Sequence, residues 1–228
     1  MGSLSIFDIA GPIMVGPSSS HTAGACKIGQ FARALYNKTP KKVLFYLHGS
    51  FGEVYKGHAT DRALLGGVMK FKTSDPQIKK SFEIAQEKNI EYKFIKKDLG
   101  ENWHPNTVKI ILENGKYKMS VIGSSIGGGM IEILQIDNFQ VKIKGRAGRY
   151  LSLVVCYEKN KKILEKLTEK IKDLGIGVAE VESTSYKNQT LSVIGLEGRR
   201  ILLPEVLDLE KISGVIFVRA LSKLQKQQ

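Results

Sequence analysis

Near the start of the chain, the stretch GPSSSHTAGA at residues 16–25 is dense in side chains suited to ligand binding. Between a proline and several small residues it places five side chains that can form hydrogen bonds: Ser18, Ser19, Ser20, His21 and Thr22. The first backbone N–H groups of a helix lack partners within it, and with the helix dipole they favour an anion. If a helix starts here, the hydroxyl groups could cap it, as Ser20 would, or bind a carboxylate or phosphate. The stretch alone leaves both interpretations open.

A second stretch, GSFGEVYKGHATD at residues 49–61, repeats this arrangement. Gly57 and His58 come immediately before a predicted helix. Thr60 and Asp61 fall in its first turn, where they are suited to capping and to the positive helix end. A lone histidine is more often structural than catalytic. Two histidines at matched helix starts favour one shared site for a small ligand.

Two further motifs are weaker candidates for the rim of this site or for a contact with another chain. One is HPNT, residues 104–107, and the other is GSSIGGGM, residues 123–130. Consecutive glycines let a backbone approach a ligand or a subunit closely, but the Lys-Ser/Thr ending of a phosphate-binding P-loop is missing. The weaker candidate residues are Ser50, His104, Asn106, Ser125 and Gly128.

The charge, the cysteine count and the apolar runs of the sequence exclude several classes of function. The chain has a formal net charge of +13, but its lysines are dispersed and no nucleic-acid-binding motif accompanies them. We therefore expect an anionic small molecule or an acidic partner chain rather than nucleic acid. The two cysteines, Cys26 and Cys156, exclude a disulfide framework and a metal cluster held by this chain alone. No apolar run approaches the ~20 residues of a membrane span, so a soluble, cytoplasmic protein is expected.

The elements that must position these residues fall into two predicted domains, as the length of 228 residues suggests. In the first half we expect a helix over 22–36, a strand over 41–50, a helix from Ala59 and a helix over 75–89 that Asp75 caps. Ala25, Gly29 and Ala32 on the first helix predict close packing against a neighbour. Residues 90–144 alternate apolar and polar side chains, which predicts antiparallel sheet with a hairpin turn at Asn114-Gly115.

After a basic, glycine-containing link at residues 144–150 the pattern changes. Strands over 150–158, 176–187, 188–197 and 214–221 and helices over 161–175 and 203–212 predict a βαββαβ, ferredoxin-like domain. Gly175 ends its first helix, and Asn188 marks the central hairpin. The fold class is therefore α+β.

In this order, GPSSSHTAGA, HGSFGEVYKGHATD, HPNT and SSIGGGM ahead of a βαββαβ tail closely resemble the beta subunit of iron-sulfur-dependent L-serine dehydratases, also called L-serine ammonia-lyases. The resemblance covers essentially the whole chain. It implies a domain over residues 1–146 similar to the allosteric-substrate-binding domain of some phosphoglycerate dehydrogenases. It also implies an ACT domain over residues 149–228.

The resemblance further implies that a separate alpha subunit ligates a four-iron, four-sulfur cluster. Serine catabolism by this complex yields pyruvate, a gluconeogenic precursor, and ammonia, with an iron as Lewis acid and a base that removes the α-proton. His21 and His58 would be catalytic or orienting. The substrate-binding residues would be Ser18, Ser19, Ser20, Thr22, Thr60 and Asp61, with Asp61 orienting His58 or capping.

One position departs from the family pattern. Many amino-acid-binding ACT domains carry Pro-Gly after the first strand, whereas this chain has Lys161-Lys162. A homodimer or packing role for this domain is therefore favoured over effector binding. The alternative function is a regulatory module that senses serine or another small anion without catalysis of its own.

Overall fold

The computed structural model describes residues 13–145 and 151–221. The chain forms two compact units, one made mostly of residues up to 137 and the other mostly of residues from 148 onward. Each unit combines one β-sheet with helices, which confirms the α+β class. The predicted link at 144–150 lies almost wholly outside the described residues, so the domain bounds stay a prediction. Within the described ranges, no helix is long and apolar enough to cross a membrane.

A six-stranded sheet with the strand order β2-β1-β3-β4-β5-β6 forms the centre of the first unit. Its strands are β1 (Lys42–Leu47), β2 (Glu91–Lys96), β3 (Thr107–Asn114), β4 (Tyr117–Gly127), β5 (Met130–Ile136) and β6 (Phe139–Gly145). The β3–β4 hairpin forms where Asn114-Gly115 predicted it, but Asn114 pairs with Tyr117, so the two turn residues are Gly115, at φ 61°, and Lys116. The β4–β5 hairpin turns through the three consecutive glycines of the GGG motif, all at positive φ.

The prediction that all strands after residue 90 are antiparallel was wrong for β2. This strand pairs in parallel with β1, with Val43 opposite Tyr92 and Leu47 opposite Lys96. The chain leaves β1, forms a series of helices and returns in the same direction, and such a helical crossover joins parallel strands. Alternation of apolar side chains indicates a strand but carries no information on its direction.

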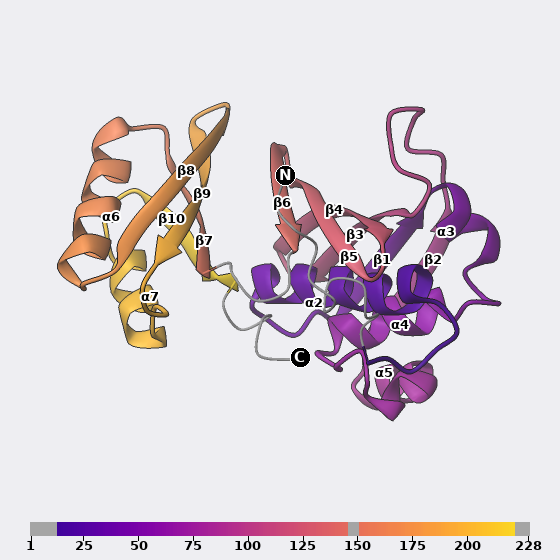
Figure 1. Ribbon diagram of the computed structural model, residues 1–228. Coiled ribbons are helices and arrows are strands. Elements are labelled where there is room, and N and C mark those ends of the chain that lie inside the picture. The colour runs from indigo at the N-terminus through magenta and orange to yellow at the C-terminus, as the bar shows by residue number, and fades with distance from the viewer. Residues whose placement is uncertain (1–12, 146–150, 222–228) are drawn as a thin grey trace, which may run out of the picture. The chain divides into compact units, whose positions relative to one another are not determined.

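The helical segments of this unit are η1 (Ser19–Gly24), α2 (Ala25–Tyr36), α3 (Gly49–Val54), α4 (Thr60–Val68), η2 (Pro76–Lys80) and α5 (Ser81–Glu87). Figure 1 shows α2, α4 and α5 on one side of the sheet. Asp75 caps η2 as predicted, because its carboxylate accepts the Gln77 N–H at 2.8 Å. The predicted strand over 41–50 ends early at Leu47, and α3 takes the place of its last residues.

Helices α2 and α4 approach each other closely through glycines. A methyl group on Gly29 would collide with the backbone of Leu64 and Val68, and one on Gly67 with the backbone of Cys26. The small-residue face predicted for α2 is therefore the face that packs on α4. This contact fixes the starts of both helices, and with them the residues that lie just before each helix.

The second unit contains β7 (Leu151–Glu158), α6 (Lys161–Asp173), β8 (Gly177–Tyr186), β9 (Gln189–Glu197), α7 (Leu203–Glu210) and β10 (Val215–Ala220). Its strand order is β10-β7-β9-β8, with every pair antiparallel. This is the predicted ferredoxin-like arrangement. Gly175, at φ 72°, follows α6 as expected, and the β8–β9 hairpin turns at residues 187–188. Side chains from the sheet and both helices form one apolar core, including Leu153, Val155, Leu167, Ile194 and Leu209.

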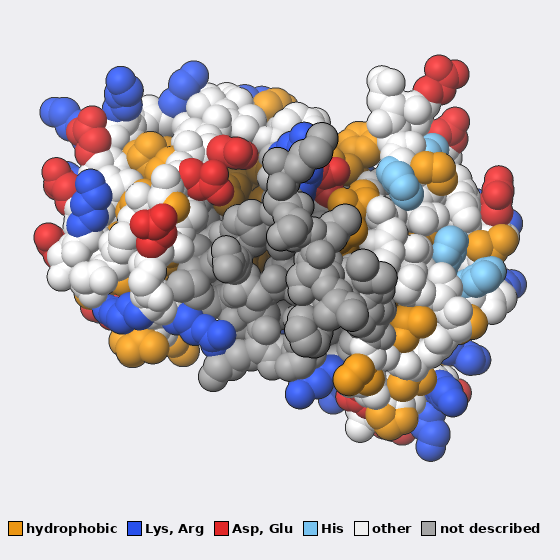
Figure 2. Space-filling model, viewed as in Figure 1, with side chains coloured by type: hydrophobic (Ala, Val, Ile, Leu, Met, Phe, Trp, Pro, Cys, Tyr) orange, Lys and Arg blue, Asp and Glu red, His pale blue; other side chains and the backbone are white. Residues whose placement is uncertain are grey.

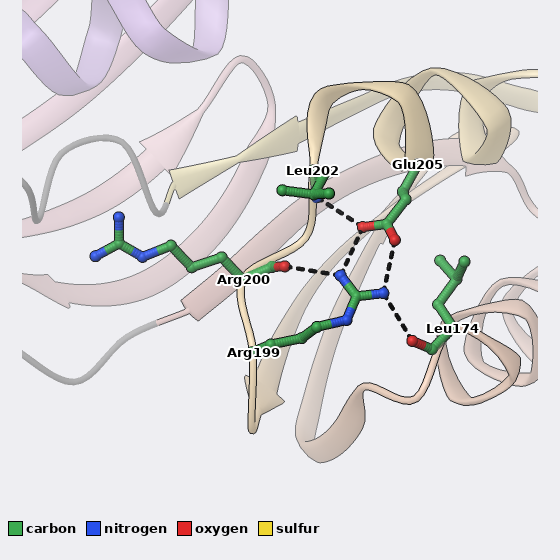
Figure 3. A network of polar contacts seen from close by, with 5 residues as sticks. All are labelled: Leu174, Arg199, Arg200, Leu202 and Glu205. Carbon is green, nitrogen blue, oxygen red and sulfur yellow. Dashed lines mark hydrogen bonds and ion pairs between the residues drawn. The ribbon is translucent and has the colours of Figure 1, made fainter.

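A guanidinium group links the two helices of this unit (Figure 3). The two terminal nitrogens of Arg199 donate to the Glu205 carboxylate at 3.0 and 2.6 Å. The second nitrogen also donates to the carbonyl oxygen of Leu174, at the end of α6, at 2.7 Å. Glu205 in turn accepts the backbone N–H of Leu202, at the start of α7, at 2.7 Å. The Arg199–Glu205 ion pair thus provides hydrogen-bond partners for a carbonyl oxygen at the end of α6 and an N–H group at the start of α7.

Candidate active site

The segment GPSSSHTAGA folds into a π-helix that continues directly into α2. Ser18 lies just before η1 in an extended conformation, and its carbonyl oxygen accepts N–H groups from Thr22 at 2.9 Å and Ala23 at 3.4 Å. Its hydroxyl oxygen accepts the His21 N–H at 3.1 Å. The cap is therefore Ser18 rather than Ser20, and helical structure begins at Ser19 rather than at Thr22. Wide π-turns of this kind are frequent at functional sites.

Serine hydroxyls lie beside both ring nitrogens of His21. Its Nε2 lies 3.0 Å from Ser50 Oγ, and its Nδ1 lies 3.5 Å from Ser18 Oγ. The Phe51 ring meets the imidazole edge-on, with centroids 5.4 Å apart. Partial burial, followed by repulsion from His58, lowers the pKa of His21 below its ordinary value of 6.5. His21 is therefore held as a neutral imidazole near pH 7.

The structure brings His58 next to His21. Their ring centroids are 5.0 Å apart and the ring planes are inclined by 37°. The carbonyl oxygen of His58 accepts a hydrogen bond from the buried Thr22 hydroxyl at 3.0 Å, which joins the two helix starts. Nδ1 of His58 is buried without a hydrogen-bond partner in the described part of the chain. The two histidines therefore lie close enough together to contact one small ligand.

Thr60 and Asp61 lie in the first turn of α4, but neither caps it. Thr60 is fully buried, and within the described ranges its hydroxyl has no partner. Asp61 accepts the N–H of its neighbour Arg62 at 2.8 Å, and no hydrogen bond joins it to His58. Burial raises the pKa of the Asp61 carboxyl group. The turn before α4 is sharp because Ala59, a non-glycine residue, has φ 54°.

The weaker candidates lie around the ends of β3 and β4. The N–H of Ser125 donates to the carbonyl oxygen of Asn106 at 2.9 Å, and the exposed His104 accepts the N–H of Asn106 at 3.0 Å. Ser125 is itself buried against Gly24 of η1, and its hydroxyl lacks a partner among the described residues. Gly128 lies exposed in the hairpin turn at φ 59°. Ser125 therefore touches the His21 segment, whereas His104 and Gly128 lie farther toward the surface.

Sequence reasoning missed a basic hollow beside His58. The hollow has a volume of about 370 Å³ and is lined by Glu53, Val54, Tyr55, Lys56, Gly57, His58 and Lys96. The ammonium groups of Lys56 and Lys96 lie 5.9 and 6.0 Å from the centre of the Tyr55 ring. Lys56 could have been found, since it belongs to the KGHATD motif. Lys96 could not, because only the parallel pairing of β2 with β1 brings it here. Figure 2 shows histidine side chains reaching the surface of the first unit around α3.

A second residue that the motifs did not reveal is Lys27 on α2. Its Nζ donates to the carbonyl oxygen of Gly129 at 2.9 Å, which fastens the glycine-rich hairpin to the helix that follows His21. Burial lowers the pKa of Lys27. A single basic residue on a helix gives no sequence signal for such a contact.

The cysteines of this chain do not fit an iron-sulfur cluster. Cys26 is fully buried on α2, its sulfur atom donates to the carbonyl oxygen of Phe71, and burial raises its pKa to about 12. A ligand to iron must be a thiolate, which this site disfavours. Cys156 is also buried, in the other unit. Among the described residues, no three His, Cys, Asp or Glu side chains form a group that could hold a metal ion.

The fold and the site together define a two-unit α+β chain with a polar, histidine-containing site in its first unit. The family model of the serine dehydratase beta chain matches residues 5–135, more than half of the 228 residues. The chain therefore belongs to the serine dehydratase beta chain family.

Two relatives agree with this assignment. The chain is 45% identical over 166 residues to the L-serine dehydratase beta chain of Peptoniphilus asaccharolyticus, an alignment that covers 72% of this chain and 73% of the relative. It is 36% identical over 215 residues to the probable L-serine dehydratase beta chain of Bacillus subtilis strain 168, covering 94% of this chain and 96% of the relative. With 215 of the 228 residues, the second alignment includes most of the ferredoxin-like unit.

Proposed function

We propose that this chain is the beta subunit of an L-serine dehydratase and forms one side of the pocket that holds L-serine for deamination to pyruvate and ammonia. One observation carries the proposal: His21 and His58 come from two helix starts far apart in the sequence, yet the centroids of their rings lie 5.0 Å apart. The names of the two relatives supply the substrate.

In this proposal the polar segment around η1 binds the ends of the amino acid. The hydroxyl groups of Ser18, Ser19 and Ser20 donate hydrogen bonds to its carboxylate, and the buried Thr60 lies behind them in the first turn of α4. Lys56 and Lys96 in the neighbouring hollow attract that negative charge. Ser125 and Asn106 complete the side formed by the sheet.

We assign the two histidines different roles toward the substrate. His21, neutral near pH 7 because burial and His58 lower its pKa, accepts the α-proton. His58 holds the carboxylate in position beside it. Loss of the α-proton and of the hydroxyl group gives aminoacrylate and water, and the aminoacrylate tautomerises and is hydrolysed to pyruvate and ammonia.

The four-iron, four-sulfur cluster belongs to a separate alpha subunit in this proposal, because the cysteines of this chain do not fit it. The roles of His21 and His58 toward the substrate do not require a direct contact with the cluster. Activity is therefore expected only when the beta chain is combined with a cysteine-bearing alpha chain.

The test is co-purification of this chain with its alpha subunit under anaerobic conditions, followed by an assay of pyruvate formed from L-serine. His21→Asn should lower kcat/KM by about 10²- to 10⁴-fold, the range for loss of a general acid or base. His58→Asn should lower kcat/KM mainly through a higher KM, because it removes a group that holds the carboxylate. His48→Asn is the matched control, because the His48 ring contacts the N–H of Leu99, at 3.2 Å, and the Asp98 carboxylate, at 3.3 Å, rather than the residues of the proposed site, and asparagine keeps an acceptor for Leu99. Normal turnover in both site variants would remove the proposed site.

The same preparation decides between catalysis and sensing. If the complete complex with an intact cluster binds L-serine but leaves it unchanged, the chain is a regulatory module instead. We assign the second unit to the ACT type, with a packing or homodimer role, because it has the ferredoxin-like order and Lys161-Lys162 open α6. Light scattering of the full chain at several concentrations tests the homodimer.

A further inference from the structure

The closest polar contact of the His21 ring comes from a distant part of the chain. Ser50 lies 29 positions later in sequence, yet its Oγ is 3.0 Å from Nε2 of His21. The Ser18 hydroxyl is 3.5 Å from Nδ1, which is long for a hydrogen bond, and it already accepts the N–H of His21. Ser50 is therefore the stronger of the two ring partners.

The backbone around Ser50 is firmly held. The N–H of His48 donates to Thr107 at 3.0 Å, and the N–H of Phe51 donates to Pro105 at 3.3 Å, so both neighbours are tied to the segment that enters β3. Gly49 has φ 51°, and a methyl group there would lie 2.8 Å from the Pro105 carbonyl oxygen. Only glycine fits, and the chain turns sharply enough to aim Ser50 at His21.

We propose that Ser50 is a positioning residue, whose hydroxyl group holds the His21 imidazole in one orientation. The proposal deepens the proposed function and rests on His21 being part of the site. In a neutral imidazole one nitrogen donates and the other accepts, and a serine hydroxyl group can pair with Nε2 in either role. Ser50 therefore holds the ring in place without a charge. A carboxylate in its place would favour the protonated ring, so the choice of serine keeps His21 able to accept a proton.

The first test reads the hydrogen bond at Nε2 directly, by nitrogen-15 NMR of the full-length chain with labelled histidine, assigned by substituting each histidine in turn. In the wild-type chain the Nε2 signal of His21 should be shifted by its hydrogen bond. Ser50→Ala should move this signal, and Ser50→Thr, which keeps the hydroxyl group, should restore it. Ser74→Ala, at an exposed serine outside the site, is the control. Unchanged His21 signals in Ser50→Ala would overturn the proposal.

The second test uses the complex with the alpha subunit. Ser50→Ala should lower kcat about 10-fold, since a misoriented base loses part of the 10²- to 10⁴-fold that proton transfer contributes, while KM changes little. Ser50→Thr should recover most of kcat, and thermal unfolding should match the wild type. Full kcat in Ser50→Ala, in a complex that His21→Asn inactivates, would contradict the proposal. If His21→Asn is itself fully active, the proposed function fails, while the NMR measurement still decides whether Ser50 holds the ring.

Discussion

His21 combines a proton-accepting ring with surroundings that keep it uncharged. Burial is the main cause of its lowered pKa, and the nearby His58 adds to it. The charged form of His21 is therefore reached only at a pH below the ordinary histidine value of 6.5.

This displacement predicts the pH dependence of the reaction. Because the folded-state pKa of His21 is lowered, the neutral ring persists as pH falls to 6.5 and is lost only below it. The acid limb of kcat/KM for L-serine should thus lie below pH 6.5. A profile of the complex between pH 5 and 8 measures it, and an acid limb above 6.5 would assign it to a different group.

Cys26 gives a second prediction at the residue scale. With a pKa near 12 and no exposed surface, its thiol should resist alkylation at pH 8 in the native chain and react fully in denaturant. Peptide mapping after iodoacetamide treatment distinguishes Cys26 from Cys156. Cys26→Ala should leave the iron content of the complex unchanged, and a loss of iron in a folded complex would contradict the assignment of the cluster to the alpha subunit.

The sequence predicted these site residues only in part. The pairing of His21 with His58 followed from their matched positions before two helices. The Ser50 contact, the Lys96 side of the hollow and the Lys27 contact with Gly129 did not. Each of these depends on how strands and helices pack, which no local pattern encodes.

At the scale of the elements, the contact between α2 and α4 holds the two helix starts of the site in their relative positions. Gly29→Ala and Gly67→Ala each place a methyl group against backbone that cannot yield easily. Overpacking of this kind typically costs about 1–3 kcal/mol, so each variant should unfold at lower denaturant concentration. Gly57→Ala is the control for stability, since its methyl group would meet only the Val54 carbonyl oxygen, at 3.8 Å. Equal midpoints for all three variants would show that the helices can separate freely.

The elements also show where sequence patterns are reliable. Asp75 at its cap and Gly175 after α6 have the predicted geometry, and the predicted β3–β4 hairpin forms with its turn one residue later, at Gly115-Lys116, because each depends on a local backbone requirement. The direction of β2 and the short helix α3 were not predicted. A six-residue helix with two glycines has too few turns to show a period, and strand direction depends on the crossover before it.

At the scale of the whole molecule, the net charge of +13 favours an acidic partner. Long-range attraction speeds encounter by about 10- to 1,000-fold and is screened by salt. The rate of association with the alpha subunit should therefore fall by at least about 10-fold between 50 and 500 mM salt, measured by stopped-flow mixing or surface binding. A rate independent of salt would show that the lysines are solvated surface residues that do not attract the partner.

The π-helix at η1 has a consequence for chain length. Successive residues of an α-helix are rotated by about 100°, so the number of residues between His21 and α2 sets where the His21 ring points. Ser19→Ala removes one hydroxyl group and leaves this spacing intact, whereas deletion of Ala23 removes no polar side chain but turns His21 away from Ser50 and His58. The deletion should be far more harmful than the substitution. In this segment the count of residues is therefore as much a part of the site as their chemistry.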